Sequence, residues 1–163
     1  MRKVIFLFFV FLAFGSAAFG QTQYESYTND RFFFSIDYPS DLLKMQAPPE
    51  NNDGRTFQSE DSSVEMRVWG QYNAEFLALG EKYNLALKGF DTQPTYMVLG
   101  KSSFVVSGIK GGKIVYVKTL YRKSRSTDAY YTLTIEYPVS KRKEYDSVVR
   151  HVATSFKLIS GDI

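Results

Sequence analysis

The segment from Pro49 to Glu60 carries oxygen-bearing side chains at a spacing close to that of a calcium-binding loop. An EF-hand loop has oxygen ligands at positions 1, 3 and 5, glycine at position 6 and a bidentate Glu at position 12. Counted from Pro49, the residues Asn51, Asp53, Gly54 and Glu60 fall at positions 3, 5, 6 and 12. Proline offers no side-chain oxygen at position 1, and the flanking segments have strand patterns instead of helical ones. The sequence therefore disfavours an EF-hand.

Two other interpretations of this loop remain open. In the favoured one it is a tight turn, in which Asp53 holds backbone amides and Gly54 adopts a positive φ. In the alternative, the rim of a ligand or partner site consists of Glu50, Asp53 and Glu60, or of Asp53 with Arg55, because binding residues concentrate on loops. Asn51 is a further candidate binding residue of this loop. A calcium-binding or small-ligand-binding protein centred on this loop is one form of that alternative.

Trp69 is the only tryptophan of the chain and another candidate binding residue. It shares a predicted strand face with the polar residues Arg67 and Gln71. An indole on the more polar face of a strand packs under a helix or marks an interface. Core packing is the favoured interpretation, and an interface is the alternative.

No catalytic constellation is evident, and no catalytic residue, metal ligand or cofactor is predicted. His151 is the only histidine, and its place beside a predicted buried helix stripe favours a structural or solvent-facing role. The carboxylates Asp37, Glu65 and Glu136 fall on predicted strands, where alternating polar residues are typical of a solvent-facing side. A hydrolase that uses two carboxylates is the alternative to a binding protein if these groups share a pocket.

The first twenty residues have the layout of a secretory signal peptide. Arg2 and Lys3 precede an apolar run, and Ala18-Phe19-Gly20 satisfies the small-x-small rule for cleavage before Gln21. The run is shorter than the ~20 residues that span a bilayer, so we expect no stable membrane insertion after cleavage. The sequence thus predicts a secreted or periplasmic protein, with a single domain over residues 21–163.

Composition excludes further classes. The chain has no cysteine, which removes disulfides, thiol nucleophiles and Cys-ligated zinc. Without Arg2 and Lys3 the 20 basic residues become 18 against 17 acidic ones, a net charge of +1. This near-neutral balance argues against a nucleic-acid partner.

The pattern of apolar residues predicts an α+β fold in which an antiparallel sheet is flanked by helices. After a polar leader, strands are expected at 32–38, 41–47, 55–60, 64–72, 95–100, 103–109, 113–122 and 130–138, and helices at 73–90 and 140–157. Strands 55–60 and 64–72 should form a β-hairpin, and Gly111-Gly112 is the expected hairpin turn after strand 103–109. Asn73 is the expected N-cap and Gly89 the expected stop of the first helix, with Phe76, Leu79, Tyr83 and Leu87 as its apolar stripe. Several strands carry large residues on both faces, so helices or loops should cover parts of both.

The segment FFFSIDYPSDLL, residues 32–43, resembles the opening of the Mog1/PsbP-like α/β/α sandwich proteins. The later segments SFVVSGIKGGKIVYVKTLY and YTLTIEYP, with the terminal helix ending in SFK, are similar to exported bacterial proteins without an assigned function. The resemblance implies the sandwich fold. It also implies a binding role, since PsbP-like proteins are accessory subunits and assembly helpers, and Mog1 binds a small GTPase. The function we expect is therefore an exported, non-enzymatic binding or assembly module with a protein partner in the cell envelope.

Overall fold

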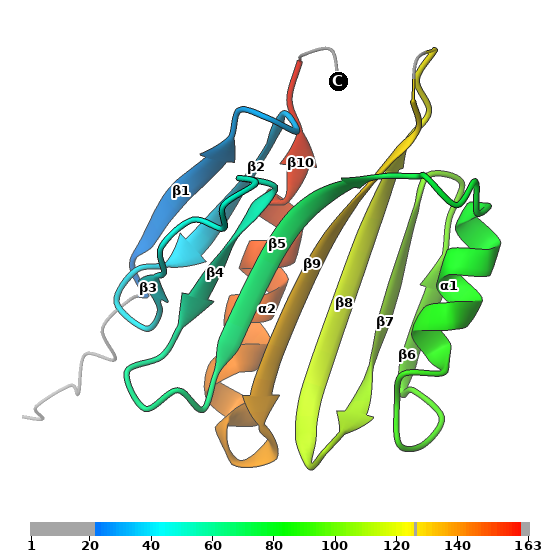
Figure 1. Ribbon diagram of the computed structural model, residues 1–163. Helices are drawn as coiled ribbons and strands as arrows, with labels where there is room; N and C mark the ends of the chain where they lie inside the picture. Colours follow the sequence, from blue (N-terminus) through cyan, green and yellow to red (C-terminus); the bar gives the residue numbers. More distant parts are fainter. Residues whose placement is uncertain (1–21, 126, 161–163) are drawn as a thin grey trace, which may run out of the picture.

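The computed structural model describes residues 22–125 and 127–160, which form two antiparallel sheets and two α-helices (Figure 1). The predicted signal peptide and its cleavage site lie outside these residues. The larger sheet has the order β3 (Lys44–Met45), β4 (Gly54–Gln58), β5 (Glu65–Tyr72), β9 (Ala129–Pro138), β8 (Lys113–Arg122), β7 (Ser103–Lys110) and β6 (Tyr96–Leu99). The smaller sheet has the order β1 (Tyr24–Asn29), β2 (Phe34–Pro39) and β10 (Lys157–Leu158). The helices are α1 (Leu79–Leu87) and α2 (Arg142–Ser155), the latter preceded by a 3-10 turn, η1 (Val139–Lys141). The predicted α+β class is confirmed.

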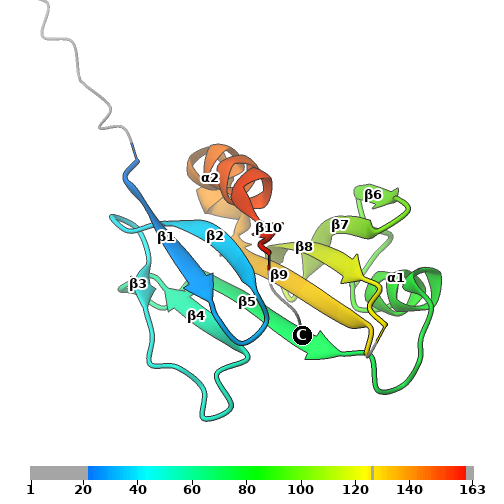
Figure 2. The same ribbon diagram turned by 90° about the horizontal axis from the view of Figure 1, so that it is seen from above.

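The core lies between one face of the larger sheet and a layer made of the smaller sheet and α2 (Figure 2). Apolar side chains at spacings of three and four place one stripe of α2 against the sheet, as predicted. This stripe consists of Tyr145, Val148, Val149, Val152 and Ala153. Complete burial of such side chains stabilises the fold by roughly 1.5–3 kcal/mol each. We call the α2 side of the larger sheet its inner face and the opposite side its outer face.

Two strands of the smaller sheet were not predicted, and the third, β2, begins later than expected. The expected strand 32–38 begins at Phe34, because Phe33 has a φ of 54° and turns the chain back from β1. The polar leader is itself a strand, β1, that pairs with β2 along its whole length. Its apolar alternation is weak because β1 lies at an edge with much of its surface in solvent. The two-residue strand β10 was also not predicted.

Helix α1 is shorter than predicted, and Asn73 is not its N-cap. Asn73 instead braces a turn: its side chain accepts a hydrogen bond from the Leu77 N–H at 3.0 Å and donates one to the Leu77 C=O at 3.0 Å. Phe76 has a φ of 53°, which no α-helix accommodates, and it is 89% exposed. The helix begins after Ala78, so the expected stripe is wrong at Phe76, while Leu79, Tyr83 and Leu87 lie in the helix and are half-buried. The stop near Gly89 is confirmed.

The two helices cover opposite faces of the larger sheet at different ends (Figure 2). α2 packs against β2, β9 and β8, whereas α1 packs against β7 on the outer face. Cover on parts of both faces is therefore confirmed. Gly111 and Gly112, with φ of 56° and 73°, form the predicted hairpin turn between β7 and β8. Within the described residues, neither helix has the length and apolar character needed to cross a membrane.

Candidate functional site

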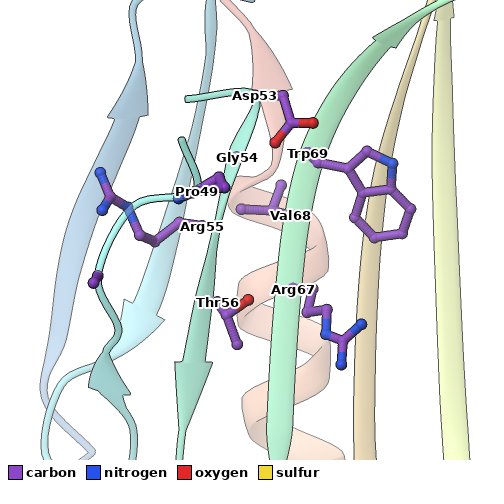
Figure 3. A pocket seen from close by; sticks show the side chains of 9 residues that line it. Pro49, Asp53, Gly54, Arg55, Thr56, Arg67, Val68 and Trp69 are labelled. Carbon is purple, nitrogen blue, oxygen red and sulfur yellow. The ribbon is translucent and has the colours of Figure 1, made fainter. Parts of the chain in front are cut away.

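A pocket of about 330 Å³ lies where the loop of residues 46–53 meets strands β4 and β5 (Figure 3). We call it the Trp69 pocket. Its walls come from Ala47, Pro49, Asp53, Gly54, Arg55, Thr56, Arg67, Val68 and Trp69. Asp53 and Trp69, two of the predicted binding residues, therefore contribute to one concave surface, and a third, Arg55, borders it although its side chain points away (Figure 3).

The register of the β4–β5 hairpin places the polar side chains of this pocket. Thr56 lies opposite Arg67 and Gly54 lies opposite Trp69, so these residues share the outer face of the sheet. A Cβ on Gly54 would lie 2.1 Å from the Val68 carbonyl oxygen. Glycine is thus required by the close approach of the two strands. The expectation that Gly54 adopts a positive φ is wrong, since Gly54 belongs to β4 and Asn52 has the positive φ of the turn, at 48°.

The loop that closes the pocket is held from within and from both sides. The Asn52 N–H donates to the Pro49 C=O at 2.9 Å, which confirms a tight turn. The Asn51 side-chain amide donates to the Asp53 carboxylate at 2.8 Å, so this carboxylate accepts from a side chain and not from the expected backbone amides. The Asp53 C=O accepts from the Gly70 N–H at 2.9 Å and thereby ties the loop to β5.

A second strand pair fastens the far side of the same loop. The Asn29 side chain donates to the Asn52 C=O at 3.0 Å, and the Arg31 guanidinium donates to the Asn51 C=O. Asn29 is itself buried, with 1% exposure. A loop with this many anchors has little conformational entropy left to lose on binding.

Trp69 lies in this pocket and not in the core. The indole N–H donates to the Gln71 side chain at 3.1 Å, and the residue is half-buried. The favoured prediction of core packing is therefore wrong, because neither helix of the described residues covers the outer face of β5: α1 packs against β7, and α2 lies on the inner face. Trp69 contributes to the wall of the pocket, and its indole extends from β5 towards β9 (Figure 3).

The other predicted loop residues have different surroundings. The Arg55 side chain lies on the inner face, where its guanidinium carbon is 5.2 Å from the centre of the Tyr27 ring. Glu60 follows the far end of β4, whose five residues separate it from Asp53 by roughly 17 Å. These two carboxylates cannot ligate one ion. Across the described residues there is no group of three or more acidic, histidine or cysteine side chains placed to hold a metal.

The three strand carboxylates are divided between the two sheets. Glu65 and Glu136 are direct cross-strand neighbours on the outer face, whereas Asp37 belongs to β2. The Arg67 guanidinium forms an ion pair with Glu65 at 2.6 Å and offsets the repulsion between the two glutamates. Arg67 thus links this charged row to the Trp69 pocket, and neither glutamate contributes to that pocket.

His151 and Asp37 form a polar contact between α2 and β2. The His151 Nε2 lies 3.1 Å from one Asp37 oxygen, and the Ser26 hydroxyl donates to the other at 2.6 Å. The imidazole also stacks on the Tyr24 ring at 3.7 Å. In a nucleophilic triad the histidine lies between the serine and the carboxylate, whereas here the carboxylate lies in the middle. The arrangement cannot activate Ser26 and suits the structural role predicted for His151.

Sequence reasoning did not identify Arg67 and Thr56 as pocket residues. The period-two alternation already placed Arg67 on the face of Trp69, and the predicted hairpin required some residue of the preceding strand opposite it. The sequence pattern did not indicate the register of the hairpin, which places Thr56 opposite Arg67. The contribution of Ala47 and Pro49 depends on how the loop folds back, which no local pattern indicates.

Neither a protein-family model nor a curated protein sequence matches the chain. Solved structures do. Cyanobacterial PsbP from Synechocystis sp. PCC 6803 is 12% identical with a TM-score of 0.54, over 88% of this chain and 96% of that one. The Ran-binding protein Mog1p of Saccharomyces cerevisiae is 10% identical with a TM-score of 0.54, over 86% of this chain and 97% of that one. The chain therefore has the Mog1/PsbP-like fold that its core segments predicted.

Proposed function

We propose that the protein is an exported, non-enzymatic binding module that contacts a protein partner of the cell envelope through the Trp69 pocket. The observation that carries the proposal is a half-buried tryptophan at a preformed pocket that also contains residues of opposite charge. Tryptophan and arginine are the residues that most often supply the binding energy of protein interfaces. Both occur here, on neighbouring outward positions of one strand.

The construction of the pocket supports recognition of a protein surface. Arg67 has a side chain that is 58% exposed, so it can reach a partner, while Asp53 places a carboxylate at the loop. Opposite charges at a rim select the orientation of a partner more than they add affinity. The anchored loop supplies the preorganised shape. The fold is also compatible with such a role, since one protein that shares it, Mog1p, is a Ran-binding protein.

Export is supported by the leader of the chain, with its basic start, apolar run and small-x-small end. N-terminal sequencing of protein recovered from the source organism tests it. A mature chain that begins at Gln21 supports export, and an intact Met1 contradicts it.

The binding role is tested by crosslinking capture from the envelope fraction of the source organism. The test variant is Asp53→Ala combined with Arg67→Ala, which removes both charges. Arg55 is left unchanged because its packing on Tyr27 serves the fold. The control is Arg150→Ala, an exposed arginine on α2. We expect one protein to be captured by the wild type and the control and lost by the double variant. Equal capture by all three contradicts a site at the Trp69 pocket.

A further inference from the structure

The sheet edges of this molecule differ in charge. Within the described residues the edge strands are β1, β3, β6 and β10. β1 contains Glu25, β3 contains Lys44 and β10 contains Lys157. Charged residues on an edge strand prevent it from pairing with another chain. β6, whose sequence is Tyr-Met-Val-Leu, is the one of the four without a charge.

The side chains of β6 are exposed on both faces of the sheet. Tyr96, Met97, Val98 and Leu99 have exposures of 54%, 38%, 45% and 48%. Four consecutive large apolar residues in solvent are unusual for a protein surface, and such patches mark interaction sites. Within the stretch from Asp91 to Lys110, the only charged residue between the two ends is Lys101.

The hydrogen-bond pattern defines which backbone groups of β6 are free to pair. The Gly100 N–H donates to the Ser103 C=O at 2.8 Å, so these two residues form a hydrogen-bonded pair of the β6–β7 ladder. Because such pairs alternate along an antiparallel ladder, Val98 and Tyr96 also bond to β7. The N–H and C=O groups of Met97 and Leu99 therefore point away from β7, along the open edge.

We propose that β6 is a pairing edge for a second copy of this chain, with the two β6 strands antiparallel about a two-fold axis. Only Met97 and Leu99 present outward groups, so each must pair with Met97 or Leu99 of the other copy. Directly opposite residues of antiparallel strands share a face. Met97 and Leu99 of both copies then lie on one face, and Tyr96 and Val98 of both copies lie on the other. The register that opposes Met97 to Leu99 suits β6 best, because it also places Val98 opposite Val98 and Tyr96 opposite Gly100 of the other copy, with no charged residue opposite the strand.

The choice of a second copy follows from the strand itself. A charge-free strand with apolar residues on both faces matches another strand of the same kind, and β6 provides this match in antiparallel self-pairing without opposing like charges. The far edge of the same sheet, β3, has only two residues and includes Lys44. Pairing through β6 is thus isologous and closes at a dimer instead of growing into a fibre.

The interface is small, since it consists of one four-residue strand from each copy. Such an interface falls below the roughly 1,200–2,000 Å² of stable complexes. The dimer should therefore dissociate on dilution. This inference concerns a different edge from the Trp69 pocket and does not depend on the proposed function.

Sedimentation velocity from about 1 to about 300 μM, where a weak interface changes state, is the first test. Met97→Pro removes an outward N–H without breaking the β6–β7 ladder, while Met97→Ala keeps that N–H and loses the side chain. We expect the wild type and Met97→Ala to shift from monomer to dimer with concentration, and Met97→Pro to stay monomeric with unchanged circular dichroism. A monomeric wild type throughout, or a dimer that Met97→Pro retains, overturns the proposal.

Single-cysteine variants give a second test that does not rely on the proline variant folding. The chain has no cysteine of its own, so Met97→Cys introduces a unique thiol at β6. Met45→Cys is the matched control, because Met45 is 41% exposed on the opposite edge strand. A bismaleimide with a reach of roughly 8 Å spans opposite and diagonal neighbours of paired strands. We expect covalent dimers from Met97→Cys alone. Equal crosslinking of both variants, or none from Met97→Cys, overturns the proposal.

Discussion

The two ends of the seven-stranded sheet are covered on opposite faces. At the β4–β5 end, the smaller sheet fills the inner face and leaves the outer face open around Trp69. At the β7 end, α1 and the loop before β6 cover the outer face, where Tyr83 packs edge-on against Phe104. The inner face there has a pocket of about 290 Å³ beside α2. The strands between them, β9 and β8, have buried residues on both faces.

The covered surfaces of the sheet stabilise the fold, whereas the open surfaces are the candidates for binding. The covered inner face at the β4–β5 end carries the aromatic core, with Phe34 touching Tyr27, Tyr131 and Phe156. The open surfaces at both ends carry large side chains outside the core, namely Trp69 at one end and the exposed apolar residues of β6 at the other.

The largest effect should come from the aromatic core. Phe34 is 0% exposed, so Phe34→Ala should lower the free energy of unfolding by about 3–5 kcal/mol. Val98 is 45% exposed on β6, so Val98→Ala should change it by less than about 0.5 kcal/mol. Urea denaturation, carried out at low protein concentration to keep the chain monomeric, measures both. Similar losses of stability in Phe34→Ala and Val98→Ala would contradict the difference between the buried core and the exposed edge strand.

A smaller effect is expected at the Trp69 pocket. Gly54→Ala places a methyl group against the Val68 carbonyl oxygen and should cost about 1–3 kcal/mol of stability as β4 and β5 separate. The emission of Trp69 should shift with it. Gly80 provides the control, because a Cβ there meets no atom within 4 Å and the residue lies in α1. Gly80→Ala should be stabilising by roughly 0.5–1 kcal/mol. A loss of stability in Gly80→Ala would contradict this account.

The packed layer of α2 should be sensitive to alkaline pH. Burial raises the pKa of Tyr137 to about 12, with Asp146 adding to the effect, and burial likewise raises the pKa of Tyr145 to about 12. A tyrosine whose folded pKa lies above its unfolded value of 10.0 stabilises the fold fully below pH 10. That stabilisation is lost as the pH rises from 10 to about 12, because the unfolded chain releases the proton first.

Urea melts at pH 8 and at pH 11 test this, with ultraviolet absorbance reporting tyrosine ionisation. Stability should fall over this interval, and Tyr145→Phe should reduce the fall. A variant that loses stability as steeply as the wild type would show that the layer of α2 is not the sensitive element.

The smallest effect is expected at Asp61, in the loop between β4 and β5. Its hydrogen bond from Lys141, followed by those from Ser59 and Ser63, holds the pKa of this carboxyl well below its usual range. Because the folded pKa is depressed, the stabilisation is present above the ordinary pKa and is lost as the pH falls towards the folded one. Asp61→Asn should flatten the dependence of stability on pH below about pH 4. If stability depends on pH in the acid range as steeply in Asp61→Asn as in the wild type, Asp61 does not contribute to this dependence.

The sequence predicted most of the fold because the strongest patterns in it are local. Alternation located β5, β7, β8 and β9, and Gly111-Gly112 located a hairpin turn. The start of α1 was predicted too early because Phe76 fits the helical spacing. In the structure the Asn73 side chain bonds to the backbone of Leu77, and the helix begins only after Ala78. β1 was not predicted because an edge strand buries few of its side chains, so its alternation of apolar and polar residues is weak.

The candidate site was predicted in part. Trp69 and Asp53 were selected from residue type and loop position, and the structure places both at one pocket. Arg55 and Glu60 were selected on the same grounds. However, strand β4 separates Glu60 from Asp53, and the Arg55 side chain lies on the inner face of the sheet. Which face a residue takes after a loop depends on the register of the hairpin. That register brings Gly54 into close contact with β5, and a contact between strands is not visible in a local pattern.

The most direct test of the proposed function uses Trp69 itself as the probe, since it is the only tryptophan in the chain. The partner identified by capture is replaced with a tryptophan-free form or segment and titrated into the purified protein, and into Met97→Pro, while tryptophan emission is recorded. The account predicts a saturable change in emission that is the same for both proteins. A partner that binds by calorimetry without changing the emission, or a change that disappears in Met97→Pro, would contradict recognition through the Trp69 pocket.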